Sequence, residues 1–146
     1  MIQRIQTLYL LAVVALGVAL IWLPVLQLVT PDGQVYNLTA LGGAPLEGLW
    51  GLTLTTVLIP LMALVDIFLF KKRLLQARLN IFSVMLCLGY YGVLAIYVWL
   101  AKMSLTAEWY INFWASFPLI CLVLTLMATR RILKDEALVR AADRIR

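Results

Sequence analysis

Histidine is absent from this sequence of 146 residues, and cysteine occurs only at Cys87 and Cys121. The lack of histidine excludes imidazole metal sites, histidine-ligated haem and histidine-based acid–base catalysis. The two cysteines stand far apart in apolar segments, so they form neither a closely spaced redox pair nor a secreted disulfide framework. We interpret both as small apolar side chains that face the core or lipid.

Charge is also scarce: charged residues make up 13% of the sequence and hydrophobic residues 64%, with a mean hydropathy of +0.99. A water-soluble domain of this length cannot hide so much apolar surface, so the composition predicts an integral membrane protein. In a soluble protein, the net charge of +5 would indicate a nucleic-acid partner. Here membrane topology accounts for the charge, and we expect no nucleic acid.

Four apolar runs are long enough to cross a hydrocarbon core of about 30 Å, which takes about 20 residues of helix. Because backbone amides must be satisfied within lipid, we expect these runs to be helices. The fold class predicted is an all-α membrane protein, a four-transmembrane-helix bundle with a short extracytoplasmic β-hairpin and a cytoplasmic C-terminal helix. The chain is expected to be a single membrane domain over 1–146, with helices at about 5–23, 49–70, 80–100 and 111–129, an outer hairpin loop at 24–48 and a cytoplasmic tail at 130–146.

Basic residues are confined to three segments, and this placement predicts the orientation. Eleven of the twelve Lys and Arg residues lie in Met1–Gln6, Lys71–Arg78 and Arg130–Arg146, and Lys102 is the exception. Basic residues next to spans stay in the cytoplasm. We therefore expect a multi-pass protein of the bacterial inner membrane with both termini cytoplasmic. The five tryptophans are expected near the outer ends of the helices: Trp22, Trp50, Trp99, Trp109 and Trp114.

The segment after the first span has the alternation of two short strands. Residues 26–30 and 34–39 flank Pro31-Asp32-Gly33, in which proline presets φ and glycine accepts a positive φ. An isolated hairpin is marginally stable in water, so it needs support from the helix ends, the membrane surface or a partner. Gly42-Gly43-Ala44-Pro45 is expected to be a flexible entry to the second helix.

Asp66 is the acidic residue that lies well inside a span, and it is the intramembrane polar candidate. In one interpretation Asp66 forms an ion pair at the interface with Lys71 or Arg73, which follow it by five and seven residues. In the other, Asp66 relays a proton or cation. Pro60 and Pro118 are predicted to lie within the second and fourth spans, where proline can kink a helix.

The tail is predicted to continue the fourth helix, with Glu136 and Arg140 four residues apart as a favourable pair. Acidic residues are interleaved with basic ones, which suits a protein partner as well as anionic lipid headgroups. The candidate residues for partner or lipid contact are Arg130, Arg131, Lys134, Asp135, Glu136, Arg140, Asp143 and Arg144.

Several segments carry a family resemblance: MIQRIQT at 1–7, PLMAL at 60–64, QARL at 76–79, KDEALVR at 134–140 and ADRIR at 142–146. The chain resembles a family of small uncharacterised membrane proteins from Bacteroidota over essentially its whole length. This resemblance implies a four-helix inner-membrane protein with a short outer loop. It supplies no activity, substrate or catalytic residue.

The sequence contains no phosphate-binding glycine loop, paired carboxylates or Cys-x-x-Cys motif. We therefore predict no enzyme, no catalytic residues, no cofactor and no metal site. The preferred hypothesis is a non-catalytic accessory or scaffold subunit of a larger membrane complex, with membrane lipids and other integral membrane subunits as partners. The alternative is a small oligomeric transporter or channel in which Asp66 couples to a proton or cation.

Overall fold

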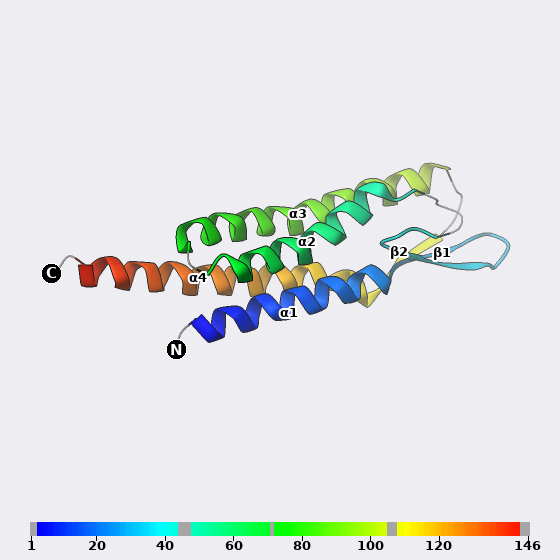
Figure 1. Ribbon diagram of the computed structural model, residues 1–146. Helices are drawn as coiled ribbons and strands as arrows, with labels where there is room; N and C mark the ends of the chain where they lie inside the picture. The colour runs from blue at the N-terminus through cyan, green and yellow to red at the C-terminus, as the bar shows by residue number, and fades with distance from the viewer. Residues whose placement is uncertain (1–2, 44–47, 71, 105–107, 144–146) are drawn as a thin grey trace.

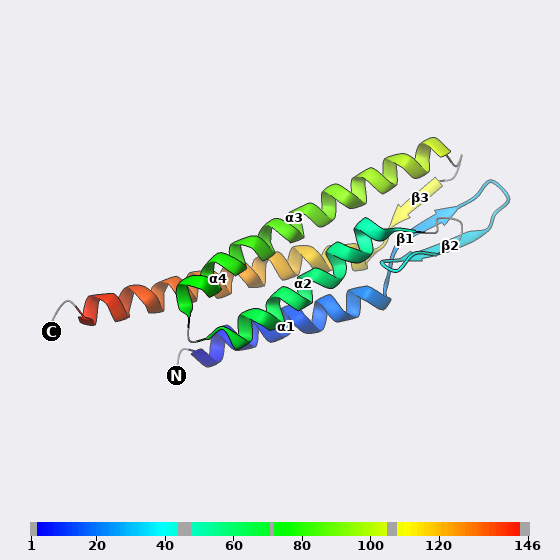
Figure 2. The same ribbon diagram turned by 45° about the horizontal axis from the view of Figure 1, so that its top comes forward.

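The computed structural model describes residues 3–43, 48–70, 72–104 and 108–143, and within them the chain forms four α-helices and a small three-stranded sheet. The helices lie side by side with similar axis directions (Figures 1 and 2). All four are long and apolar enough to cross a membrane. Their bounds are α1 Gln3–Trp22, α2 Trp50–Phe68, α3 Arg73–Ser104 and α4 Phe117–Asp143.

Successive helices run in opposite directions, and each packs against two neighbours. α1 and α3 each contact both α2 and α4. Both chain ends and the α2–α3 connection lie at one end of the bundle, which we call the terminal end (Figure 1). The strands lie at the other end, which we call the sheet end. α4 extends past the other helices at the terminal end.

The core follows a repeat in which buried residues alternate three and four positions apart. This spacing keeps one seam of each helix facing its neighbours. The large apolar side chains on the opposite faces are exposed, for example Leu8, Leu61 and Met85. The buried seams contain Gln6, Leu10, Val13 and Leu20 on α1; Leu52, Thr56, Ile59, Ala63 and Asp66 on α2; Gln76, Asn80, Ser83, Cys87, Tyr90 and Leu94 on α3; and Cys121, Thr125, Ala128 and Ile132 on α4.

Glycine and proline bring α1 and α2 close together. A Cβ atom added at Gly17 would lie 2.9 Å from Cδ of Pro60. Pro60 lies inside α2, as the sequence predicted. Pro118 also lies within its predicted span, which covers Phe113–Ala141. It is the second residue of α4, so it occupies the first turn, where the missing N–H costs little.

The sheet consists of β1 Pro24–Val29, β2 Val35–Thr39 and β3 Glu108–Ile111, in the order β2-β1-β3 with both pairs antiparallel. The predicted hairpin is present. Gly33 has a φ of +76° and donates its N–H to the carbonyl oxygen of Thr30 at 2.9 Å. β3 comes from the segment between α3 and α4, and its pairing with β1 makes this a three-stranded sheet, so the hairpin is not isolated.

Two predicted helix starts are wrong. The third helix begins at Arg73 and not near residue 80, because Arg73 and Arg78 form its first turns although their charge suggested a loop. The fourth helix begins at Phe117 and not at 111, because Glu108–Ile111 pairs with β1 and the 3-10 helix η1 (Phe113–Ser116) follows. The predicted tail helix is confirmed to Asp143. Ala44 and Pro45 of the expected flexible entry lie outside the described residues.

Candidate functional site

Polar side chains are buried mainly in the half of the bundle next to the terminal end. Those on the seams near this end come from all four helices, whereas seam residues near the sheet end, such as Leu20, Leu52 and Leu94, are apolar. Buried polar side chains are expected to have hydrogen-bond partners, so each exception requires an explanation. The buried polar residues of the terminal half are Gln6, Asp66, Gln76, Asn80, Ser83, Thr125 and Thr129.

Asp66 is completely buried, and neither of its carboxylate oxygens has a hydrogen-bond partner. Its backbone carbonyl accepts a hydrogen bond from Nε2 of Gln76 at 3.0 Å. This bond fixes the position of α3 along the axis of α2. The predicted ion pair with Arg73 is not formed, because Asp66 lies on the buried seam of α2 whereas Arg73 begins α3 beside an open cleft. Lys71, the other predicted partner, lies outside the described residues.

Asn80 and Ser83 are the next residues on the buried seam of α3, and their side-chain polar atoms also have no partner. Helical side chains lean toward the N-terminus of their own helix. Since α2 and α3 are antiparallel, the Asp66 side chain leans toward the sheet end and the Asn80 side chain leans toward the terminal end, where Asp66 lies. A carboxylate, an amide and a hydroxyl therefore lie on the facing buried seams of α2 and α3, and we call these three residues the buried polar layer. Oxygen atoms of these types can bind a proton, a water molecule or a hard cation.

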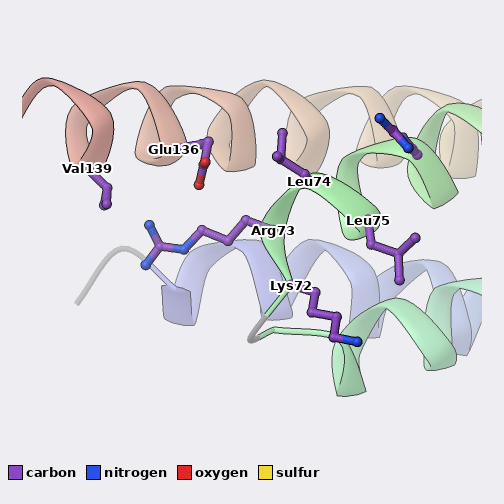
Figure 3. A pocket seen from close by; sticks show the side chains of 7 residues that line it. Lys72, Arg73, Leu74, Leu75, Glu136 and Val139 are labelled. Carbon is purple, nitrogen blue, oxygen red and sulfur yellow. The ribbon is translucent and has the colours of Figure 1, made fainter. Parts of the chain in front are cut away.

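A basic cleft of about 650 Å³ opens at the terminal end, between the start of α3 and the part of α4 that extends past the bundle. In Figure 3 the Arg73 side chain extends beneath α4 toward Val139, and Glu136 points from α4 into the same space. The cleft therefore combines three cations with an apolar lining. Its lining residues are Lys72, Arg73, Leu74, Leu75, Arg78, Glu136 and Val139.

The candidate contact residues of the tail separate onto different faces of α4. Asp135 accepts a hydrogen bond from Nε2 of Gln6 at 2.8 Å, which joins α4 to the first turns of α1. Glu136 faces the basic cleft and pairs with Arg140, with 3.1 Å between Oε1 and Nε, as the sequence predicted. Arg130, Arg131 and Lys134 are exposed.

Two candidate residues of the tail add nothing to the described site. Asp143 is the last residue of α4, and the structure describes its backbone alone. Arg144 lies outside the described residues. Across the described part of the chain, no group of three or more His, Cys, Asp or Glu side chains is placed to hold a metal ion.

Sequence reasoning missed Gln6, Gln76 and Asn80, which the structure places in the buried seams. A signal for them exists in the sequence: each lies at a position where the alternating spacing of three and four residues continues from apolar seam residues. Gln76 was excluded because residue 80 was taken as the start of the third helix, whereas Gln6 and Asn80 stood at the ends of predicted spans and were not considered as buried polar residues.

The family comparison covers nearly the whole chain. The model of a family described as a domain of unknown function, DUF4293, matches residues 2–145. The chain belongs to this family. No curated protein and no solved structure matches the chain.

Membership of the DUF4293 family agrees with the expected resemblance in its extent and in the absence of an assigned activity. The Bacteroidota range and the opening and closing motifs of the resemblance stay predictions. Apolar helices of this length are compatible with a membrane protein. Any role for the buried polar layer or the basic cleft therefore rests on the chain's own chemistry.

Proposed function

We propose that the protein is a multi-pass protein of the bacterial inner membrane, with both termini in the cytoplasm, and acts as a non-catalytic accessory or scaffold subunit of a larger membrane complex. The distribution of charge supports the orientation. The terminal end carries Lys72, Arg73 and Arg78 together with the basic residues of α4, whereas the sheet end carries Lys102 with Asp32 and Glu108. Basic residues next to spans are retained in the cytoplasm.

The extension of α4 is the observation that favours a scaffold role. α4 continues without a break to Asp143, well past the ends of its neighbours (Figure 1). Leu133, Leu138 and Val139 are about half exposed on this extension, among side chains of both signs. An exposed helix with apolar residues and mixed charge is suited to docking on another protein chain. The Gln6–Asp135 hydrogen bond holds the base of the extension against α1.

Site-directed crosslinking in native membranes tests this proposal. Cys87 and Cys121 are buried, so the variant Ala137→Cys provides an exposed thiol on the α4 extension. A matched control, Asp32→Cys, provides an exposed thiol in the hairpin turn at the sheet end. We expect a thiol-reactive crosslinker to join Ala137→Cys to a defined companion chain, in amounts close to one per chain, and Asp32→Cys to give none of this product. Purification of the uncrosslinked protein in mild detergent without companion chains would contradict the scaffold role.

The buried polar layer favours a second candidate, a small oligomeric transporter or channel. Asp66, Asn80 and Ser83 lie in the seam between α2 and α3 without partners, and ionisable groups at such positions commonly belong to ion or proton paths. In liposomes, the transporter hypothesis predicts cation or proton flux in the wild type that is lost in Asp66→Asn. Flux that persists in this variant removes Asp66 from the path, and a lack of flux in the wild type removes the hypothesis.

A further inference from the structure

We propose that the basic cleft is a binding site for the phosphate of an anionic phospholipid. This inference rests on the proposed membrane location but is independent of the scaffold role. It concerns one defined cleft between α3 and α4, and not a general attraction of the tail to the membrane surface.

The charges around the cleft leave a positive excess that no other described residue neutralises. Glu136 is the acidic residue of the lining, and its carboxylate is already engaged by Arg140 at 3.1 Å. Within the described part of the chain, Lys72, Arg73 and Arg78 take part in no ion pair. The cleft is therefore lined by two arginines and one lysine that have no ion-pair partner among the described residues. Guanidinium groups match phosphate oxygens in geometry as well as in charge.

The apolar part of the lining distinguishes a phospholipid from a soluble anion. Leu74, Leu75 and Val139 are each 42–49% exposed at the cleft, where a free phosphate would gain nothing from them. Phe82 follows Leu75 by seven residues, so it lies on the same face of α3, and it is also exposed. This face therefore carries exposed apolar side chains both at the cleft and farther along the outside of the bundle. A ligand with a phosphate at one end and an acyl chain at the other fits such a surface.

The position and size of the cleft are consistent with a lipid headgroup. It lies beside the first turns of α3 and the part of α4 that follows Arg130 and Arg131, where the proposed orientation places the cytoplasmic headgroup layer. Basic pockets between helices on the cytoplasmic side are known binding sites for anionic headgroups. The volume of about 650 Å³ is within the usual range of small-molecule sites.

The test compares two triple variants of the full-length chain in detergent. The cleft variant carries Lys72→Gln, Arg73→Gln and Arg78→Gln. The control carries Arg130→Gln, Arg131→Gln and Lys134→Gln, which removes three exposed cations outside the cleft. Native mass spectrometry titrates each protein with phosphatidylglycerol and with phosphatidylcholine. We expect the wild type to prefer phosphatidylglycerol at least tenfold, the cleft variant to lose this preference, and the control to stay within threefold of the wild type.

A second variant keeps the test decisive if the cleft variant fails to fold. Val139→Glu places a carboxylate in the lining and leaves all three cations in place, and Val139 is 43% exposed, so the bundle tolerates the change. We expect at least a tenfold loss of phosphatidylglycerol binding in Val139→Glu, with unchanged binding of phosphatidylcholine. Phosphatidylglycerol binding by Val139→Glu at the wild-type level would overturn the inference.

Four further results would overturn the proposed site. Equal losses in the cleft and control variants would show diffuse attraction in place of a defined site. Displacement of phosphatidylglycerol by millimolar inorganic phosphate would assign the cleft to a soluble anion. A wild type that requires detergent for extraction but shows no lipid preference would remove the cleft site while leaving the membrane location intact, whereas a wild type that is soluble without detergent would remove the membrane location itself.

Discussion

The two ends of the bundle differ in how completely their polar groups are hydrogen-bonded. At the sheet end, strand pairing satisfies the backbone, and side chains complete it: Nδ2 of Asn112 donates to the carbonyl oxygen of Pro24 at 3.1 Å, and Oγ1 of Thr53 donates to that of Ala40 at 2.6 Å. At the terminal end, Asp66 and Asn80 are fully buried and their side-chain atoms have no partner.

This difference indicates that one end of the bundle stabilises the fold and that the other end is suited to contacts with other molecules. An unpartnered buried polar group costs about 1–3 kcal/mol, so Asp66 and Asn80 reduce the stability of the terminal half. The same half carries the open basic cleft and the extension of α4. Groups that are costly for folding often lie at sites of function. The sheet end therefore contributes to the stability of the bundle, and we propose that the terminal end offers the surfaces that contact other molecules.

The prediction with the largest expected effect concerns the orientation of the bundle in the membrane. The comparison of the two ends depends on this orientation. Replacing Lys71, Lys72, Arg73 and Arg78 together by Gln removes the basic residues that follow α2 and those in the first turns of α3. We expect mixed topologies in this variant, because basic residues flanking a span retain it on the cytoplasmic side. Reporter fusions at the C-terminus measure the fraction of each orientation. The matched control replaces four basic residues of the α4 region, Arg130, Arg131, Lys134 and Arg140. Uniform insertion of the first variant would show that the remaining basic residues suffice.

Much of the fold follows from the sequence because lipid imposes a simple rule on helix length. The four helices, the Pro31-Asp32-Gly33 turn and the tail helix were predictable from local patterns alone. The strand β3 was not, because its partner β1 lies about eighty residues earlier and Glu108–Ile111 adjoins an apolar run that resembles the start of a span. The start of α3 was missed because charge was taken as a sign of a loop, although Arg is a good helix former.

The candidate site was less predictable than the fold. Asp66 was identified from its type and position, but the lack of a partner depends on which side of α2 faces α3. The basic cleft needs both Arg73 and Val139, which approach each other only when α4 extends past the bundle. No local pattern relates residues that are 66 positions apart, so this part of the site required the structure.

Close packing between α1 and α2 provides the second prediction. We expect Gly17→Val to lower the free energy of unfolding by about 1–3 kcal/mol, because a Cβ at this position would lie 2.9 Å from Pro60. Thermal unfolding in detergent micelles measures the change. The matched control is Gly89→Ala in α3, where an added Cβ meets nothing within 4 Å and alanine favours the helix by about 0.5–1 kcal/mol. If Gly17→Val is as stable as the wild type, the helices separate without cost and packing does not fix the bundle.

The third prediction concerns the loss of folding stability caused by the buried polar layer. We expect Asp66→Leu to raise the free energy of unfolding by about 1–3 kcal/mol in detergent, because it removes an unpartnered buried group. Asp135→Leu is the contrasting variant: it loses the hydrogen bond from Gln6 and is expected to be less stable by about 1 kcal/mol. Chemical denaturation followed by tryptophan fluorescence compares the two. A loss of stability in Asp66→Leu would show that the carboxylate holds a stabilising ligand or water in the buried layer.

The smallest effect comes from two adjacent tyrosines of α3 that differ in their hydroxyl groups. The hydroxyl of Tyr91 donates to the carbonyl oxygen of Ala115 at 2.9 Å and accepts the N–H of Leu119 at 3.0 Å, so it joins α3 to the start of α4. The hydroxyl of Tyr90 is buried without a partner. We therefore expect Tyr91→Phe to cost about 1 kcal/mol and Tyr90→Phe to be neutral or slightly stabilising, as measured by thermal unfolding in micelles. The two substitutions remove the same atom from neighbouring residues, so the difference between them isolates the hydrogen bonds. Equal effects would mean that these bonds do not help to hold α3 against α4, and the sheet end would lose one of the contacts that distinguish it from the terminal end.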